Sequence, residues 1–182
     1  MKAGSSQDGG ALGALEEAEH QGLPAVGSRF GSRGRTITES DVTMFAALTG
    51  DRHPQHTDAE WARSSIFGER IAHGLLVLSF ALALGDLDAS RVIALRRLRN
   101  VVFKRPTRFG DTIRAEVTVA STHVVAEGTG LVGLDWVVSN ARGETLVRAS
   151  MDVLWRTDSA PSQNSREFYG DDLDLPDGFV PC

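Results

Sequence analysis

The stretch "IAHGLLVLSFALALGDLD", residues 71–88, contains the longest apolar run of the chain. Apolar residues occupy nearly every position from Leu75 to Leu84, and Gly85 is placed to end a helix. A helix on the protein surface keeps a polar face, but this segment is apolar on nearly every side. We therefore expect a central helix that is wrapped by protein on all sides.

The sequence after this helix has the patterns of β-strands. From Val92 onward, valine-rich segments with alternating apolar and polar residues are separated by the turn sequences "FGD" and "NARGE". Such short connections favour long antiparallel strands. Helices that come first and strands that follow indicate the α+β class, and an antiparallel sheet curled around the central helix is the simplest way to bury both.

Two shorter helices are predicted before the central one. Thr38 and Asp41 have the spacing of a capping box, and apolar residues recur at helical intervals from there to Gly50. The later segment "TDAEWARSSIF" suits a second helix, capped by Thr57 or Asp58. The connection between the two helices, "GDRHPQH", is unusually rich in titratable side chains.

The chain of 182 residues is long enough for one domain with a hydrophobic core. Residues 1–22 combine glycine, serine and charge with almost no large apolar side chain, so we predict a disordered N-terminal tail. We predict a single domain over residues 23–157. Residues 158–182 are polar and acidic, and we expect them to form a C-terminal tail.

Composition restricts the class of protein. A net charge of -5 argues against general nucleic-acid binding, which needs a basic excess. The apolar run is shorter than a membrane span, and the N-terminus does not resemble a signal peptide, so we expect a cytoplasmic protein that does not enter the membrane. Cys182 is the only cysteine, which excludes an intramolecular disulfide and a cysteine metal cluster.

Two motifs suggest functions that their context does not favour. "GTGLVG" (128–133) matches a dinucleotide-binding pattern, but that pattern needs a helix after it and a predicted strand follows here, so its glycines are interpreted as strand irregularities. A metal site is the second possibility, and we expect none, because Pro54 breaks the helical face that would align the ligands. The ligand-type residues in question are His53, His56, Asp58 and His73.

The sequence resembles a known family. The 33 residues "ALTGDRHPQHTDAEWARSSIFGERIAHGLLVLS" resemble the characteristic sequence of the MaoC-like dehydratases, which include the R-specific enoyl-CoA hydratases. The flanking segments "RTITESDV" and "FKRPTRFGDTI" are similar to that family as well. The resemblance implies a hotdog fold, in which a long antiparallel sheet wraps a central helix, and usually a homodimer whose sheets join.

The resemblance also implies a set of site residues. The catalytic acid of the family falls on Asp51, its catalytic histidine on His56, and the glycine that directs a backbone N–H at the thioester carbonyl falls on Gly74. A purely structural interpretation remains open, with Asp51 and His56 as loop caps and Gly74 as a close-packing residue. His53 stands where the family commonly has asparagine. The serine that some members place near the acyl group is replaced by Leu82.

The chemistry of hydration fits these residue types. Addition of water across the double bond of a trans-2-enoyl thioester needs a base for the water, and His56 is near its pKa at neutral pH. Asp51 is expected to orient the water and to share the proton transfer. An unpaired N–H at a helix start, as at Gly74, favours the negative charge that develops on the thioester oxygen. We therefore predict a hydratase or dehydratase that interconverts trans-2-enoyl and (R)-3-hydroxyacyl thioesters.

Two other functions remain open at this stage. A hotdog thioesterase would release the free thiol of coenzyme A from a saturated acyl-CoA. A non-catalytic acyl-binding subunit of a hotdog heterodimer would bind the same ligands without reacting with them. The presence of Asp51, His56 and Gly74 together argues against both.

The segment "RRLRNVVFKRPTR" (96–108) carries six basic side chains and no acid. Arginine and lysine bind phosphate oxygens, and coenzyme A or the pantetheine arm of an acyl carrier protein brings phosphate to the pocket mouth. We expect no metal and no cofactor other than this substrate-borne group. A solvated basic face is the alternative. The predicted substrate-binding residues are Arg97, Arg99, Lys104 and Arg105.

Overall fold

The computed structural model describes residues 22–157, so the predicted tails, apart from Gly22, lie outside the described residues. One antiparallel sheet dominates this part of the chain, with the strand order β1-β4-β5-β6-β3 and β2 paired to β4. Four of its strands are long, as the turn sequences predicted. The strands are β1 (Arg29–Gly31), β2 (Arg35–Thr36), β3 (Val92–Phe103), β4 (Thr112–Ala126), β5 (Thr129–Asn140) and β6 (Thr145–Arg156).

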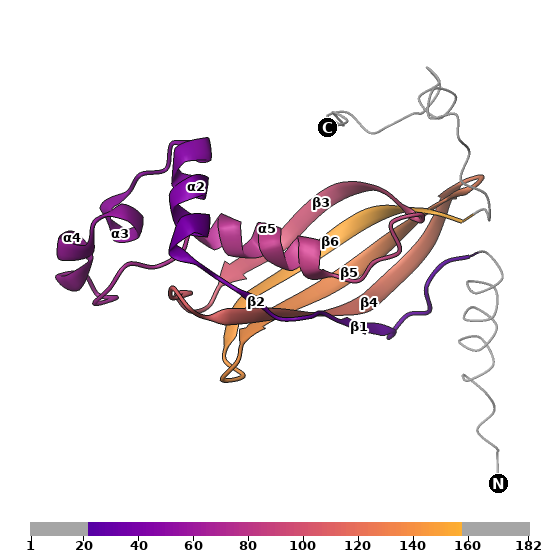
Figure 1. Cartoon of the computed structure of the whole chain (residues 1–182). Coiled ribbons are helices and arrows are strands. Elements are labelled where there is room, and N and C mark those ends of the chain that lie inside the picture. Colours follow the sequence, from indigo (N-terminus) through magenta and orange to yellow (C-terminus); the bar gives the residue numbers. More distant parts are fainter. Residues whose placement is uncertain (1–21, 158–182) are drawn as a thin grey trace, which may run out of the picture.

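The central helix α5 (Gly74–Leu84) lies along one face of the curved sheet, and its buried side chains join those of the sheet in one hydrophobic core (Figure 1). The chain thus has the hotdog fold. Gly85 ends the helix as predicted, but its φ of -62° is not left-handed. A Cβ at this position would collide with the ring of Trp136, so the glycine is required for close packing against the sheet.

The described chain does not cover α5 on every side, and in this respect the sequence prediction was wrong. Leu76, Val77 and Ala81 are buried, but 61% of Leu75 is exposed. The hydroxyl of Ser79, also exposed, donates to the carbonyl of Leu75 at 2.8 Å. One side of the helix therefore remains accessible within this chain.

Three further helices gather beyond one end of the sheet (Figure 1). They are α2 (Glu39–Thr49), α3 (Pro54–Thr57) and α4 (Ala59–Arg63). The capping box of Thr38 and Asp41 is present, and Gly50 ends α2 in the left-handed conformation, with φ 78°. Both features confirm the sequence prediction.

A short helix that was not predicted, α3, precedes the second predicted helix. Pro54 is its first residue, where the missing N–H of proline is not needed. Asp58 caps α4 and accepts from the N–H of Trp61 at 3.0 Å, which settles the choice between Thr57 and Asp58. The helix then ends at Arg63, four residues before the end of the predicted segment.

The "GTGLVG" segment forms a turn and the start of β5, as predicted. Gly128 has a φ of 69°, and Gly133 lies opposite a register shift between Val119 and Ser121 in β4. A Cβ on Gly133 would collide with the Ser121 hydroxyl. The glycines therefore allow the turn before β5 and close packing within the sheet, and no helix starts at them.

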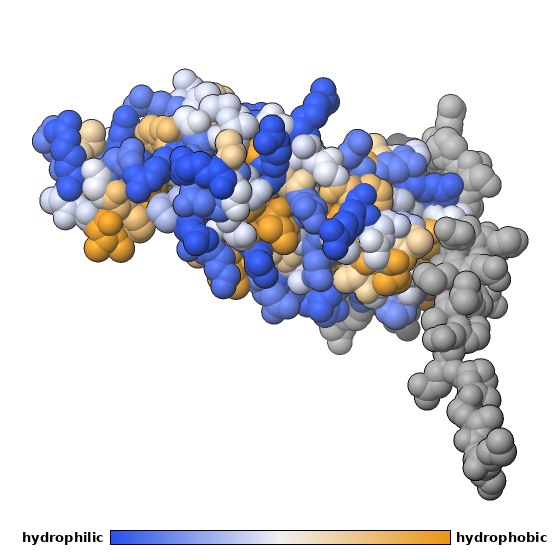
Figure 2. All heavy atoms as spheres, turned by 90° about the horizontal axis from the view of Figure 1, so that it is seen from below, coloured by the Kyte–Doolittle hydropathy of each residue, from blue (hydrophilic) through white to orange (hydrophobic). Residues whose placement is uncertain are grey.

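The molecular surface is mixed in character. On the face that Figure 2 shows, hydrophobic patches are separated by charged and polar side chains. No helix within residues 22–157 is long and apolar enough to cross a membrane.

Candidate active site

The segment between α2 and α4 is ordered by short-range hydrogen bonds. The backbone N–H of Asp51 donates to the Thr49 hydroxyl, and the Asp51 carboxylate accepts from the N–H of His53 at 3.3 Å. These contacts turn the chain sharply after Gly50. The Asp51 side chain remains 54% exposed, which leaves its second oxygen accessible.

His53 caps α3. Its Nδ1 accepts from the backbone N–H of Gln55 at 3.2 Å, and its ring packs edge-on against Trp61, with the ring centroids 5.3 Å apart. Sequence analysis assigned no role to this histidine. In the structure His53 is the N-cap of α3, and its ring nitrogen is the side-chain acceptor that such a cap requires.

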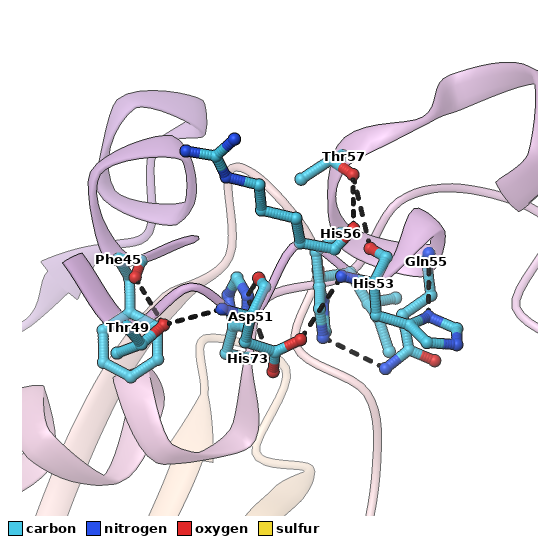
Figure 3. Close-up of polar contacts among 10 residues, drawn as sticks. Phe45, Thr49, Asp51, His53, Gln55, His56, Thr57 and His73 are labelled. Atoms are coloured by element: carbon cyan, nitrogen blue, oxygen red, sulfur yellow. Dashed lines mark hydrogen bonds and ion pairs between the residues drawn. The ribbon is translucent and has the colours of Figure 1, made fainter. Parts of the chain in front are cut away.

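His56 is buried, and its hydrogen bonds define its tautomer. Nδ1 lies 2.8 Å from the carbonyl oxygen of Ile71, which can only accept, so Nδ1 carries the hydrogen. The Nε2 of the neutral ring is then an acceptor. The side-chain nitrogen of Gln55 lies 3.0 Å from it and donates (Figure 3).

Burial lowers the pKa of His56 below the ordinary value for histidine. The hydrogen bond to Ile71 and the charge of Asp51 oppose this shift, while His73 and His53 add to it. A neutral imidazole with a lone pair at Nε2 is the form that acts as a general base.

His73 precedes α5 and is almost entirely buried. Its Nε2 lies 3.0 Å from the backbone carbonyl of Asp51 and must donate to it. The ring stacks on that of His56, with centroids 3.7 Å apart and a tilt of 27°, and Phe45 packs nearby. His73 thus links the start of α5 to the backbone of the Asp51 loop.

Asp51, His56 and His73 converge from two segments, and their ligand-type atoms lie within 4.8 Å of one another (Figure 3). Such a cluster invites comparison with a metal site. An imidazole binds a cation in the plane of its ring, and stacked rings direct their lone pairs into separate, nearly parallel planes. The arrangement therefore favours proton transfer over a shared cation, and Asp58, which caps α4, takes no part in it.

A cavity of about 470 Å³ opens beside these residues. Its walls are largely apolar, and polar groups that include Asp51 and His56 lie among them, which is the pattern of a small-molecule site. Of the predicted site residues, the structure brings five to this cavity. They are Asp51, His56, Gly74, Lys104 and Arg105.

Gly74 is the first residue of α5, where backbone N–H groups have no partner within the helix. It lies on the cavity wall. A Cβ at this position would lie 2.7 Å from the ring of Phe103, so close packing also requires glycine. The two interpretations of Gly74 are compatible, since both depend on the missing side chain.

Arg97 and Arg99 lie elsewhere, and their predicted role in substrate binding has no support in the structure. Both pair with the buried carboxylate of Asp152 on β6, at 3.5 and 2.5 Å. Neither lines the cavity. Only Lys104 and Arg105, which follow β3, remain at the cavity wall.

A family model for the MaoC-like domain matches residues 23–137. The chain belongs to the MaoC-like domain family. The match begins before β1 and ends within β5, so it includes Asp51 and His56, the whole of α5, and Lys104 with Arg105.

This MaoC-like domain has curated relatives. It is 39% identical over 88 residues to an (R)-specific enoyl-CoA hydratase of Rhodospirillum rubrum, a match that covers 48% of the chain and 61% of the relative. It is 36% identical over 86 residues to a 3-hydroxybutyryl-CoA dehydratase of Methylorubrum extorquens, covering 47% and 55%. The matched region thus spans less than two thirds of each relative.

A solved structure extends the similarity to most of the domain. The X-ray structure of a monoamine oxidase regulatory protein from Archaeoglobus superimposes with a TM-score of 0.71 at 39% sequence identity. The superposition covers 75% of this chain and 93% of that one. The MaoC-like domain described here therefore corresponds to nearly all of that protein.

Proposed function

We propose that this MaoC-like domain catalyses the reversible addition of water to trans-2-enoyl thioesters, with (R)-3-hydroxyacyl thioesters as the products. One observation carries the proposal: the His56 tautomer that Ile71 selects leaves Nε2 as an acceptor beside a largely apolar cavity. The (R)-specific enoyl-CoA hydratase and the 3-hydroxybutyryl-CoA dehydratase among its relatives support the same reaction class.

The water-activating step falls to His56 and Asp51. Nε2 of His56 takes a proton as the water oxygen forms its bond to C3 of the acyl chain, and the accessible Asp51 carboxylate accepts the other O–H and orients the water. Both side chains line the cavity, so a single water molecule can contact both of them.

The electron pair of the double bond moves toward the thioester, where an enolate-like oxygen develops. We propose that the N–H of Gly74 at the start of α5 donates to this oxygen, where the helix dipole favours negative charge. Because this donor is already fixed by the helix, it needs no reorganisation during the reaction.

The step closes when C2 receives a proton and the carbonyl is restored. The proton that His56 accepted is returned, with Asp51 sharing the transfer, so the pair ends in its starting state. Water supplies every atom that is added. The reaction therefore needs neither an oxidant nor a reductant, and we propose that no cofactor takes part besides the group that carries the acyl chain.

Lys104 and Arg105 are proposed to bind phosphate of that carrier, either coenzyme A or the phosphopantetheine arm of an acyl carrier protein. Both are exposed and lie on the cavity wall, where a cation can meet a phosphate at the entrance. They form no ion pair with an acid within residues 22–157 at 4.0 Å or less. Arg97 and Arg99 differ, because both pair with the carboxylate of Asp152.

We further propose a homodimer that forms through β3. Within the described chain this strand pairs only with β6, so its other edge offers unpaired backbone groups. Four of its large apolar side chains are between 41% and 48% exposed: Leu95, Leu98, Val102 and Phe103. Pairing with a second copy would cover them and extend the sheet.

The experiment is a substrate panel. Purified protein is given crotonyl-CoA and longer trans-2-enoyl-CoAs, the loss of the conjugated thioester is followed by absorbance, and the configuration of the product is determined. We expect hydration to the (R)-3-hydroxy product. In parallel, saturated acyl-CoAs are tested with a thiol reagent. Release of free thiol without any hydration would reject the proposal in favour of a thioesterase.

A further inference from the structure

Gln55 lies against the nitrogen that the proposed reaction uses as a base. Its side-chain nitrogen is 3.0 Å from Nε2 of His56, and both residues line the cavity (Figure 3). An imidazole nitrogen has one lone pair in the ring plane. The Gln55 amide and a reacting water molecule therefore compete for the same acceptor.

The backbone of Gln55 is held on both sides, so this contact does not arise from a loose loop. Its N–H donates to Nδ1 of His53 at 3.2 Å, and its carbonyl accepts from the N–H of Ile71 at 3.1 Å. Ile71 in turn accepts from Nδ1 of His56. The amide of Gln55 thus extends from a fixed backbone toward a fixed ring.

The Gln55 amide, as it is oriented, favours the neutral form of its neighbour. Its NH₂ group donates to the lone pair of the neutral ring. The imidazolium has no lone pair at Nε2, so it cannot accept this hydrogen bond. A carboxylate at this position would favour only the charged ring, and an apolar side chain would favour neither form through hydrogen bonding.

We propose that Gln55 is a positioning residue that holds His56 in the neutral form that acts as a base: its amide nitrogen donates to Nε2 in the resting protein and so favours the neutral ring over the imidazolium. The catalytic consequence rests on the proposed hydration. The effect of Gln55 on the protonation of His56 does not, because it is a property of the ligand-free protein.

Several charged or titratable groups also face His56. Asp51 favours the charged ring, while His53 and His73 oppose it, as does burial. Lys104 and Arg105 stand on the same cavity wall. Any test must therefore leave these groups unchanged and alter only the amide.

The test is an NMR titration of the His56 ring in ligand-free protein, with ¹⁵N shifts to identify the tautomer. Wild type is compared with Gln55→Met, which removes the donor at similar length, and with Gln55→Glu. Thr57→Ala is the matched control, because Thr57 bonds to loop carbonyls in the same helix without contacting the His56 ring. Circular dichroism confirms that each variant is folded.

We expect a neutral wild-type ring with its hydrogen on Nδ1. The proton affinity of His56 should rise about two- to tenfold in Gln55→Met, because the loss of one ordinary hydrogen bond changes an equilibrium by about this factor. It should rise further in Gln55→Glu. Thr57→Ala should titrate like wild type. An unchanged titration in Gln55→Met, an equal shift in Thr57→Ala, or a wild-type hydrogen on Nε2 would each overturn the inference.

The kinetic arm uses the pH dependence of kcat/KM for crotonyl-CoA, which reports on the free enzyme. Its acidic limb should move to higher pH in Gln55→Met together with the NMR titration. A protein that shows the titration shift but hydrates no enoyl-CoA would support the inference and reject only the proposed function. If Gln55→Met is active but the acidic limb of its kcat/KM profile does not shift with the NMR titration, the proposed role of Gln55 in positioning the base is contradicted.

Discussion

The ring of His73 stacks on the ring of His56, with centroids 3.7 Å apart and a tilt of 27°. The same side chain donates through Nε2 to the backbone carbonyl of Asp51 at 3.0 Å. One buried residue at the start of α5 therefore contacts both members of the proposed catalytic pair. The distance between Asp51 and His56 depends on a residue that belongs to a different segment of the chain.

Replacement of His73 tests this link. His73→Phe keeps an aromatic ring against His56 but leaves the Asp51 carbonyl without its donor. We expect kcat for hydration to fall about ten- to a hundredfold through misplacement of Asp51, and the free energy of unfolding to fall by about 1–3 kcal/mol. Enzyme kinetics and urea unfolding measure the two effects. A fully active His73→Phe would show that the hydrogen bond does not position Asp51.

The pH dependence of the reaction follows from the state of His56. Burial lowers its pKa in the folded protein, so the ring stays neutral, and competent as a base, to below the ordinary value of about 6.5. We therefore expect kcat/KM to be constant near neutral pH and to decline only at more acidic pH, as the ring gains a proton. A midpoint of the acidic limb above about 6.5 would contradict this assignment.

Gly74 can be tested for packing separately from catalysis. Gly74→Ala places a Cβ against the Phe103 ring, and we expect a loss of about 1–3 kcal/mol in the free energy of unfolding. Phe103→Leu in the same protein should recover most of that loss, because the smaller side chain makes room. Thermal or urea unfolding of the single and double variants provides the comparison. If the double variant does not recover stability, contact with Phe103 is not the reason that position 74 requires glycine.

If Lys104 and Arg105 bind phosphate, KM should depend on whether the group that carries the acyl chain has a phosphate. We expect the double variant Lys104→Ala/Arg105→Ala to raise KM for crotonyl-CoA about tenfold, with a smaller effect at high salt. KM for the corresponding pantetheine thioester, which has no phosphate, should be unchanged. Arg97→Ala is the matched control and should behave like wild type, since Arg97 pairs with Asp152 away from the cavity. Equal losses on both substrates would argue against a phosphate contact.

Much of this architecture was predictable from local sequence. The apolar run of α5, the capping box of Thr38 and Asp41, and the turn sequences between strands each act over a few residues, and all three are observed. The short strands β1 and β2 were not predicted. With three residues in β1 and two in β2, these strands are too short to show a pattern of alternating apolar and polar residues. They form because both pair with β4.

The site was predictable only where a family resemblance named its residues. Asp51 and His56 lie five residues apart in the chain, so their proximity follows from sequence. The pairing of Arg97 and Arg99 with Asp152 was not predictable, because it joins two strands more than 50 positions apart in the chain. The stack of His73 on His56 and the contact of Gln55 with Nε2 likewise depend on side-chain orientations that only the folded chain defines.

The most direct test of the central claim is hydration of crotonyl-CoA by wild type, Asp51→Asn and His56→Ala. Asp58→Asn serves as the control, since Asp58 is an acid of the same loop that caps α4 outside the cavity. We predict an active wild type and control, and a loss of about 10²- to 10⁴-fold in kcat for each of the other variants. Folded Asp51→Asn and His56→Ala proteins that keep the full wild-type rate would contradict the account.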